Sequence, residues 1–471
     1  MDQTLRLPFK PFQLNAYWIT AAILLFVLIV FRYISDPVLI FILAFSIGIF
    51  PLLIGNRLLL MYLTFLSFFM AQSYYLSIFT NLTSFRWFFL GVSVFVAITY
   101  PMLSKIKIRK TWKENWWVWV FSAFAIGSTL YSMNPLLTIL RTFTLMCVFF
   151  FMSRFIKPMA EIYGVSRIIG LMLYAILPLF LYSLTLLGSP EGYNVYENTY
   201  ETLMRKSLSQ RLGMANTAGD FDRFHGIFQN PNSLGLTTAL LFPLALSKVL
   251  TERKNRVLQF LLLIMTVLLL MSGSRLGIIA TLVSSLYVLV RFFGQRVGKW
   301  IAGAVFVLAV IFSVMWISNN GDKVLSYFRF DKRNVLLAGG RVEAWLVAKN
   351  FIVERPLLGY GFGTEDQLLF NQGYRFMYHE GAYLHSSYLG LLAQVGILGT
   401  ALFLIPVFWL LATELRARSP SALRIGLQGM LIAGLIACFF ESWIYSAGNA
   451  QVLPFWSGIA LLEFLRDKEK K

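Results

Sequence analysis

Arginines and one histidine stand at the ends of long apolar segments, in three short phrases of the sequence. The phrases are Arg223-Phe-His225-Gly226, Ser-Gly-Ser-Arg275 and Leu-His385-Ser-Ser-Tyr-Leu. A guanidinium is permanently charged and binds phosphate oxygens with a fork of N–H groups. An imidazole can gain or lose a proton near neutral pH. Together these groups suit the binding of a phosphate at a lipid surface and the transfer of one proton.

Three of these residues also have an interpretation that involves no chemistry. Arg275 could extend to lipid head groups, although the Gly and Ser residues before it leave space for a ligand. Arg223 could pair with Asp220 or Asp222 in its own loop. His385 could be a hydrogen-bonded histidine at the membrane surface. The functional interpretation of each is therefore a hypothesis for the structure to place in space.

Two other polar residues are further candidates. His225 follows Arg223 by two positions and could act as a second acid or base. Arg141 lies inside the apolar run Thr138–Met152, where a cation is costly unless it is paired or functional. Glu441, near the end of another apolar run, is one residue that could pair with it. A functional and a structural interpretation of Arg141 are both open.

The sequence predicts no metal site and no other cofactor. The three histidines, at positions 225, 379 and 385, lack the close spacing of a ligand pair on one helix. Arginines would then have to neutralise any anion that is bound. Cys147 and Cys438 lie inside apolar runs, which predicts free thiols.

The composition requires a membrane. Hydrophobic residues make up 58% of the 471 residues, and charged residues only 13%; a soluble domain would carry about 25% charged residues. Apolar runs of spanning length predict an all-α polytopic integral membrane protein with about 14 transmembrane helices (roughly 12 to 14). The runs lie near Tyr17–Phe31, Pro37–Ile54, Leu58–Phe79, Trp87–Leu103, Trp116–Tyr131, Thr138–Met152, Ile168–Leu187, Leu234–Leu250, Val257–Met271, Gly277–Phe293, Trp300–Ile317, Tyr388–Leu411, Leu423–Phe440 and Leu453–Leu465.

The net charge of +19 is mostly a topology signal. More than half of the Lys and Arg residues fall in alternate connections, which the positive-inside bias places in the cytoplasm together with both termini. This placement argues against nucleic acid as a partner. One membrane domain is predicted, with an N-terminal scaffold (1–187), an outer loop (188–233), central helices (234–317), a large outer loop (318–385) and C-terminal helices (386–471).

The two outer loops contain recognisable local signals. Asn230-Pro231-Asn232 predicts the start of a helix. Residues Arg341–Arg355 predict an amphipathic helix between a Gly-Gly pair and Pro356. Residues 357–364, with glycine at three alternate positions, predict a close backbone turn. The apolar face expected for the amphipathic helix consists of Val342, Trp345, Leu346, Ala348 and Ile352.

Five phrases, in this order, resemble those of the O-antigen ligase and polysaccharide polymerase superfamily, and the resemblance covers about residues 188–400. One departure is His385-Ser386, where members often have His-Asn. The phrases are Arg223-x-x-Gly226…Asn230-Pro231-Asn232, Gly273-Ser-Arg275, Gly340-Arg341-Val-Glu-Ala-Trp345, Arg355-Pro356-Leu-Leu-Gly359-Tyr-Gly361-Phe-Gly363 and His385-Ser-Ser-Tyr-Leu…Gly396-Ile-Leu-Gly399.

The resemblance implies an inverting, metal-independent membrane glycosyltransferase whose donor is a glycan on undecaprenyl pyrophosphate. By the match of phrases, Arg223 and Arg275 would hold the pyrophosphate, and Arg341 would be a further contact. Arg211 is an alternative to Arg223, because the arginine spacing in this loop varies among members. His385 would be the general base, at a site on the extracytoplasmic side of a bacterial cytoplasmic membrane.

The expected reaction is polymerisation of lipid-linked repeat units into an O-antigen, capsule or exopolysaccharide. A ligase that transfers the glycan to lipid A core or to a protein would use the same chemistry. A transporter or flippase for the same lipid-linked glycans is an alternative of another class, but it would have polar groups near mid-membrane. Expected partners are the lipid-linked donor, the bilayer, and a chain-length regulator and flippase of the same pathway.

Overall fold

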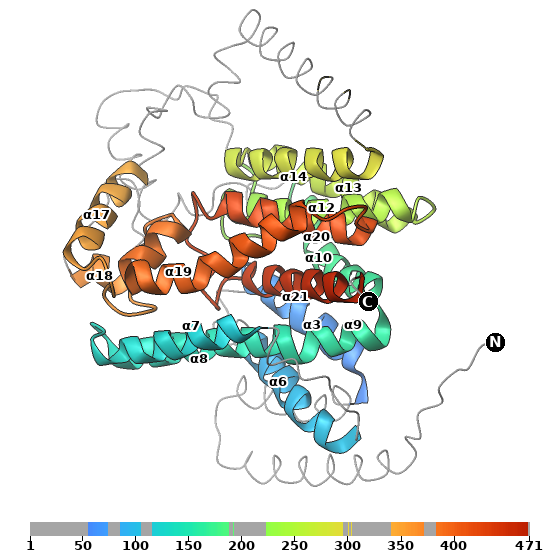
Figure 1. Cartoon of the computed structure of the whole chain (residues 1–471). Helices are drawn as coiled ribbons and strands as arrows, with labels where there is room; N and C mark the ends of the chain where they lie inside the picture. The colour runs from blue at the N-terminus through green and yellow to red at the C-terminus, as the bar shows by residue number, and fades with distance from the viewer. Residues whose placement is uncertain are drawn as a thin grey trace, which may run out of the picture.

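The computed structural model describes residues 55–73, 85–104, 115–187, 192, 223–294, 300, 303, 341–371 and 383–469. Over these residues the chain is helical, apart from turns and isolated bridge residues such as the pair Ser73 and Phe228. The elements form one bundle, with α17 and α18 at one end of it (Figure 1). They are α3 (Arg57–Met70), α6 (Phe85–Ser104), α7 (Trp116–Gly127), η2 (Ser128–Leu130), α8 (Pro135–Phe150), η3 (Phe151–Ile156), α9 (Lys157–Tyr163), α10 (Val165–Thr185), α12 (Pro231–Thr251), α13 (Arg256–Ser272), α14 (Arg275–Phe293), α17 (Arg341–Glu354), α18 (Glu365–Asn371), α19 (Ser387–Leu415), α20 (Ala422–Ala437) and α21 (Val452–Glu469).

Most of the helices coincide with predicted apolar runs, and the described residues form helices rather than sheets, which confirms the all-α class. The helices long and apolar enough to cross a membrane, among the described residues, are Pro135–Tyr163, Val165–Thr185, Pro231–Thr251, Arg275–Phe293 and Ser387–Leu415. The total of about 14 spans and the cytoplasmic position of both termini stay predictions. The runs near 17–31, 37–54 and 300–317 lie outside the described residues.

One predicted connection is itself helical. The runs Thr138–Met152 and Ile168–Leu187 predicted a cytoplasmic connection between them, and this connection contains Arg154 and Lys157. Instead α8 continues through the π-helical segment η3 into α9, so one helical stretch extends from Pro135 to Tyr163. It ends at Gly164, whose φ of +84° suits glycine. The apolar pattern located this span correctly, but it gave no signal that the helix continues past the polar residues.

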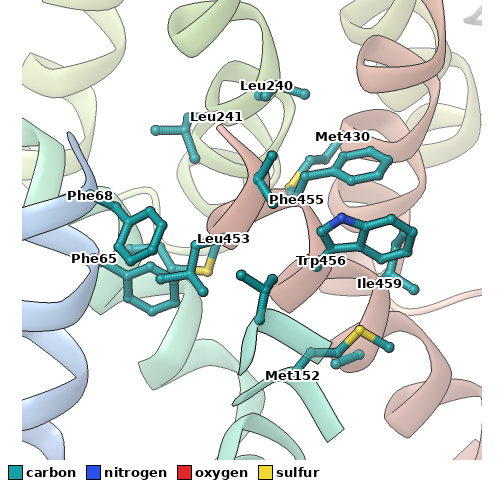
Figure 2. Close-up of a cluster of buried hydrophobic side chains, with 14 of the residues drawn as sticks. Phe65, Phe68, Met152, Leu240, Leu241, Met430, Leu453, Phe455, Trp456 and Ile459 are labelled. Atoms are coloured by element: carbon teal, nitrogen blue, oxygen red, sulfur yellow. The ribbon is translucent and has the colours of Figure 1, made fainter. Parts of the chain in front are cut away.

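The core of the bundle is formed around α21 (Figure 2). Trp456 of α21 is fully buried, and its ring lies 5.1 Å from that of Phe149 and 5.5 Å from that of Phe403, measured between centroids. Phe65 of α3 and Met430 of α20 are buried in the same cluster. In a membrane the lipid is as apolar as these side chains, so close packing rather than water exclusion holds the helices together.

Small residues let α12 and α14 approach closely. A Cβ atom added to Gly277 would lie 2.8 Å from the backbone of Gly235, and one added to Gly235 would lie 2.4 Å from the side chain of Ser274. Glycine is therefore required at both positions, 235 and 277, where α12 and α14 cross. This packing fixes the N-terminus of α14, where Arg275 stands.

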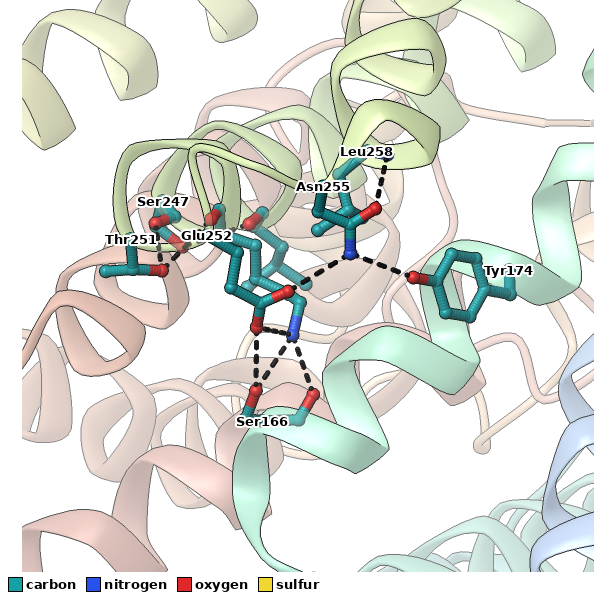
Figure 3. Close-up of polar contacts among 9 residues, drawn as sticks. Ser166, Tyr174, Ser247, Thr251, Glu252, Asn255 and Leu258 are labelled. Atoms are coloured by element: carbon teal, nitrogen blue, oxygen red, sulfur yellow. Dashed lines mark hydrogen bonds and ion pairs between the residues drawn. The ribbon is translucent and has the colours of Figure 1, made fainter.

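Polar side chains lock the other end of α12 to its neighbours (Figure 3). Lys248 donates to Glu252 at 2.7 Å and to the hydroxyl of Ser166 on α10 at 2.8 Å. Asn255 caps the start of α13 and also contacts Glu252 and the hydroxyl of Tyr174. The connection between α12 and α13 is thereby tied to α10.

Candidate functional site

The Asn-Pro-Asn phrase begins α12, as predicted. The side-chain oxygen of Asn230 accepts a hydrogen bond from the backbone N–H of Ser233 at 2.8 Å, which caps the helix. Pro231 occupies the first turn, where its missing N–H group costs nothing. Asn232 then faces Arg223, which precedes the helix in the chain.

Arg223 joins the start of α12 to the end of α13. Its Nη2 donates to Oδ1 of Asn232 at 2.8 Å, and its Nε donates to the carbonyl oxygen of Ser272 at 2.9 Å. The backbone N–H of Phe224 donates to the carbonyl oxygen of Met271. The guanidinium is therefore held at the helix ends, beside the turn that leads to Arg275.

The Ser-Gly-Ser-Arg phrase is a two-residue turn between α13 and α14. Gly273 ends α13 in the left-handed region with a φ of +54°, a conformation that glycine adopts at little cost. Ser274 caps α14 by accepting from the N–H of Gly277 at 3.3 Å. Arg275 is consequently the first residue of α14. A cation at the positive end of a helix dipole is unfavourable by itself. An anion bound there would be stabilised both by the guanidinium charge of Arg275 and by the helix dipole.

His385 has a strained backbone directly before α19. Its φ of +50° lies in the left-handed region, which costs a residue with a Cβ atom about 1–3 kcal/mol. The residues on both sides are held: the N–H of Leu384 donates to Glu365 at 2.7 Å, and the N–H of Ser386 donates to the hydroxyl of Ser442 at 3.1 Å. These contacts fix an unusual backbone conformation at the residue predicted to move a proton.

Glu441 lies between His385 and Arg341. Its Oε1 accepts from Nη2 of Arg341 at 2.9 Å, and its Oε2 lies 3.8 Å from Nδ1 of His385. All three side chains are about one-fifth exposed. Burial alone would raise the pKa of Glu441, but the His385 imidazole and the Arg341 guanidinium outweigh it and hold the pKa below the usual range of a glutamate. Glu441 is therefore ionised and can orient the imidazole.

Arg275 belongs to the same group of charges. Arg341, the first residue of α17, lies close enough to Arg275 for the two guanidinium charges to repel each other. Two cations held near each other favour an anion that binds both of them. Contacts thus connect Arg223 to the α13–α14 turn, and electrostatic interaction connects Arg275 through Arg341 and Glu441 to His385.

Glu365, the first residue of α18, was missed as a member of this site. Its side chain is buried, and its carboxyl accepts from the hydroxyl of Ser442 at 2.8 Å and makes a short hydrogen bond with the hydroxyl of Tyr445. Burial raises the pKa of Glu365 above its usual range, although these hydrogen bonds and the nearby His385 oppose the shift. An acid in the first turn of a helix is common, so the sequence offered no signal of this role.

The glycine-rich phrase docks against a break in α19. The helix is interrupted at Gly396, where φ is +61°. The N–H groups of Tyr360 and Gly361 donate to the carbonyl oxygens of Ala393 and Gln394 at 3.1 and 2.8 Å. Backbone groups that the break would leave without hydrogen bonds are thereby satisfied by the loop, as a membrane interior requires. The predicted close backbone turn is confirmed. It places Glu365 within hydrogen-bond distance of the backbone of Leu384, the residue before His385.

The contacts of Arg141 favour a structural role for this residue. Its guanidinium makes a two-pronged contact with Asp366 at 2.6 and 2.8 Å and also donates to the carbonyl oxygen of Gly363. Glu441, the partner considered from the sequence, pairs with Arg341 instead. Arg141 on α8 therefore anchors the glycine-rich loop.

The remaining candidates differ in how the structure places them. His225 is only 1% exposed, and burial lowers its pKa, so it is a neutral interior residue in this structure. Arg211 and His379 lie outside the described residues. The predicted helix 341–355 is confirmed as α17, but its expected apolar face is partly wrong: Leu346 is 59% exposed, whereas Val347 and Phe351 are buried. Packing against α19 selects a face rotated from the one expected.

The assembled group is suited to holding an anion next to a proton acceptor. Guanidinium groups come from α14 and α17 and from the segment before α12, and the imidazole comes from the start of α19. Fixed cations stabilise negative charge that develops on a leaving group, and an imidazole with an oriented Nδ1 can take a proton at Nε2. The roles of Arg223, Arg275, Arg341 and His385 stay predictions.

Comparison with protein families gives one match. Residues 260–404 match the family model described as O-antigen ligase. The matched region begins in α13 and contains Arg275, Arg341, the glycine-rich loop and His385; Arg223 and Glu441 lie outside it. No curated protein matches the chain. The resemblance noted in the sequence is therefore confirmed for this region: residues 260–404 are similar to the O-antigen ligase family, which supports the O-antigen ligase and polymerase superfamily.

Proposed function

We propose that the chain is a glycosyltransferase that polymerises undecaprenyl-pyrophosphate-linked oligosaccharide repeat units into a cell-surface polysaccharide. The observation that carries the proposal is the contact of Glu441 with both Arg341 and His385 at the ends of apolar helices, with the charge of Arg275 acting on that of Arg341. This group lies largely within the region that matches the O-antigen ligase family. Its residue types suit a donor that carries a pyrophosphate and an acceptor that loses a proton.

The site faces the extracytoplasmic side of a bacterial cytoplasmic membrane in this proposal. Exposed cations such as Arg253, Lys254 and Arg256 gather at the connection between α12 and α13, at the end of α12 away from Arg223. Positively charged connections favour the cytoplasm. The opposite ends of the same helices, with His385, would then meet the lipid-linked donor on the outer face.

The arginines would stabilise the leaving group. In the reaction, the bond between the anomeric carbon of the donor sugar and the pyrophosphate oxygen breaks, and its electron pair stays on the undecaprenyl pyrophosphate. Arg275 and Arg341, with Arg223 beside the α13–α14 turn, would bind the phosphate oxygens as this charge develops. The guanidinium forks are already fixed at helix ends, so little reorganisation is required.

His385 would act on the acceptor. The acceptor hydroxyl attacks the anomeric carbon from the face opposite to the pyrophosphate, and a new C–O bond forms with inversion. The hydroxyl proton passes to Nε2 of His385, while Glu441 at Nδ1 stabilises the imidazolium that results. No metal enters this scheme, because the guanidinium groups supply the positive charge.

A ligase is the second candidate, because the matching family model is described as O-antigen ligase. A ligase would transfer the finished glycan to lipid A core or to a protein, with the same residues in the same roles. A flippase and a chain-length regulator of the same pathway are the proposed partners in either case.

The experiment supplies purified protein in detergent with an undecaprenyl-pyrophosphate oligosaccharide and separates the products by size. A polymerase makes a ladder of products that grow by one repeat unit. A ligase makes a single transfer product, and only when its acceptor is added. No product under either condition would contradict the proposal, provided that the protein elutes as a folded species. A variant with Arg253→Gln, at the opposite end of the bundle, is the matched control and keeps full activity.

A further inference from the structure

The end of the bundle opposite His385 contains a cavity rich in arginine. Helices α19 and α20 both extend from the His385 region to the turn that connects them, residues 416–421. The 16 residues of α20 separate the two ends by roughly 24 Å, at about 1.5 Å per residue. The cavity is therefore remote from the site described above.

Four guanidinium groups line this cavity. It has a volume of about 440 Å³, and its lining residues are Thr413, Arg416, Ala417, Arg418, Ser419, Arg424 and Arg466. Arg424 is buried and paired with Glu414, which fixes one wall. Arg416 and Arg418 are exposed, and neither belongs to the core. Arg466 also has a carboxylate beside it, that of Asp467 at 3.3 Å. The exposed guanidinium groups of Arg416 and Arg418 therefore carry most of the positive charge that favours an anion in the cavity.

The backbone around the cavity is held in place. Ser419 has a φ of +49°, which a serine adopts at a cost, and Arg291 of α14 donates to the carbonyl oxygen of Ala417 in the same turn. The helix α20 begins at Ala422, and the side chain of Ser421 does not cap it. The positive end of the α20 dipole therefore adds to the field of the arginines.

The cavity lies next to an exposed apolar face. Ile405 and Trp409 of α19 are 62% and 68% exposed. Their spacing from Arg416, at 11 and 7 positions, places all three on one side of the helix. A tryptophan followed by arginines about two turns later is typical of the boundary between the hydrocarbon and the head groups. An acyl chain against Ile405 and Trp409 would bring its own head group to the cavity.

We propose that this cavity binds the phosphate of an anionic phospholipid, with its acyl chains along the exposed face of α19. Arg416 and Arg418 on the turn and Arg466 on α21 bind the phosphate oxygens through charge-assisted hydrogen bonds. Basic pockets between membrane helices on the cytoplasmic side recognise lipid phosphates in this way. The lipid, rather than free phosphate, is the ligand because the apolar face leads directly into the arginines.

The test is native mass spectrometry of the full-length protein in a neutral detergent, which removes the general attraction of a charged membrane surface. Phosphatidylglycerol is titrated against phosphatidylcholine, and the fraction of protein that retains one lipid is measured. Wild type retains phosphatidylglycerol at about tenfold lower concentration than phosphatidylcholine, because the net negative charge of phosphatidylglycerol strengthens its hydrogen bonds to the guanidinium groups. Inorganic phosphate at equal concentration does not displace it.

Two double variants complete the experiment. Arg416→Gln with Arg418→Gln removes two exposed cations from the cavity and weakens phosphatidylglycerol retention about tenfold. Arg253→Gln with Lys254→Gln removes two exposed cations at another helix connection of the same end and changes retention less than about twofold. Equal effects of the two pairs, equal retention of both lipids, or displacement by inorganic phosphate would each overturn the proposal. Arg466→Gln, on a different helix, must weaken retention as well.

Discussion

Cations at the two ends of the helix bundle differ in their burial and in their carboxylate partners. At the end with the α12–α13 and α19–α20 connections, buried cations have close carboxylates: Lys157 with Glu463 at 2.8 Å, and Arg424 with Glu414 at 2.8 Å. These four side chains are at most 9% exposed. At the His385 end, Glu441 is shared by an arginine and a histidine that are about one-fifth exposed.

The difference separates structural charges from charges available to a ligand. A buried pair that loses one partner leaves an uncompensated charge in an apolar interior, so its removal mainly costs stability. At the His385 end, one carboxylate is shared by two partly exposed basic side chains. Part of their positive field therefore remains available to a ligand at the surface. The contrast predicts that substitutions in the buried pairs at one end destabilise the protein, and that substitutions in the charged group at the His385 end inactivate it.

The largest stability effect is expected for Glu414→Ala. Glu414 is fully buried, and its carboxylate accepts from Arg424 and from the side chain of Gln428. Its removal destabilises the protein by about 3–5 kcal/mol. The measurement is thermal or denaturant unfolding in detergent, with Glu441→Ala as the comparison. A loss for Glu441→Ala as large as that for Glu414→Ala would break the distinction between the two ends.

His385→Gln tests whether a substitution at the His385 end lowers activity without lowering stability. We expect kcat to fall by about 10²- to 10⁴-fold, because the proton acceptor is lost. The unfolding midpoint should stay close to that of wild type, since the side chain is partly exposed. Product formation and thermal unfolding are measured on the same preparation. A folded variant with undiminished turnover would remove His385 from the mechanism.

Glu441→Gln should have a smaller effect, since Glu441 acts through His385. A drop in kcat of roughly 10- to 100-fold is expected, with KM changed less. The pKa of Glu441 is held below the usual range, so its contribution to stability is present above the unfolded pKa and is lost as the pH falls through the folded pKa. The stability of wild type should therefore decline below about pH 4, and Glu441→Gln should decline less steeply there.

The packing of the helices could be predicted only in part from the sequence. Continuous apolar runs located α12, α13, α14 and α20 closely, since lipid-facing and core-facing residues are both apolar. The same uniformity hides which face of a helix is buried, and this is why the apolar face of α17 was partly wrong. The Asn230-Pro231-Asn232 phrase identified a helix start because the chemistry of a capping residue is local.

The sequence named candidate residues of the site only where they lie in compact phrases. Arg275 and His385 stand next to Gly and Ser residues that form turns, and those turns are visible in the sequence. The roles of Glu441 and Glu365 depend on contacts with residues far away in the chain, such as Arg341 and Tyr445. Neither acid belongs to a phrase of unusual composition, so only the fold reveals them.

The smallest expected effect belongs to Glu365→Gln. Because its pKa is raised, ionisation of Glu365 makes the folded state less stable as the pH rises from the unfolded pKa through the folded pKa. Glutamine imitates the protonated acid and still contacts Tyr445 and Ser442. The variant should match wild type at low pH and exceed it by up to about 1 kcal/mol near neutral pH. A variant that is less stable at all pH values would show that Glu365 is ionised in the folded state.

Arg275→Ala gives the most direct test of the central claim, that guanidinium groups at the His385 end hold a lipid-linked pyrophosphate. The variant and an Arg253→Ala control are compared for product formation from an undecaprenyl-pyrophosphate oligosaccharide, after both are shown to insert and fold. The account predicts that Arg275→Ala loses at least about 10²- to 10³-fold in turnover, while Arg253→Ala resembles wild type. Wild-type product formation by Arg275→Ala would contradict it.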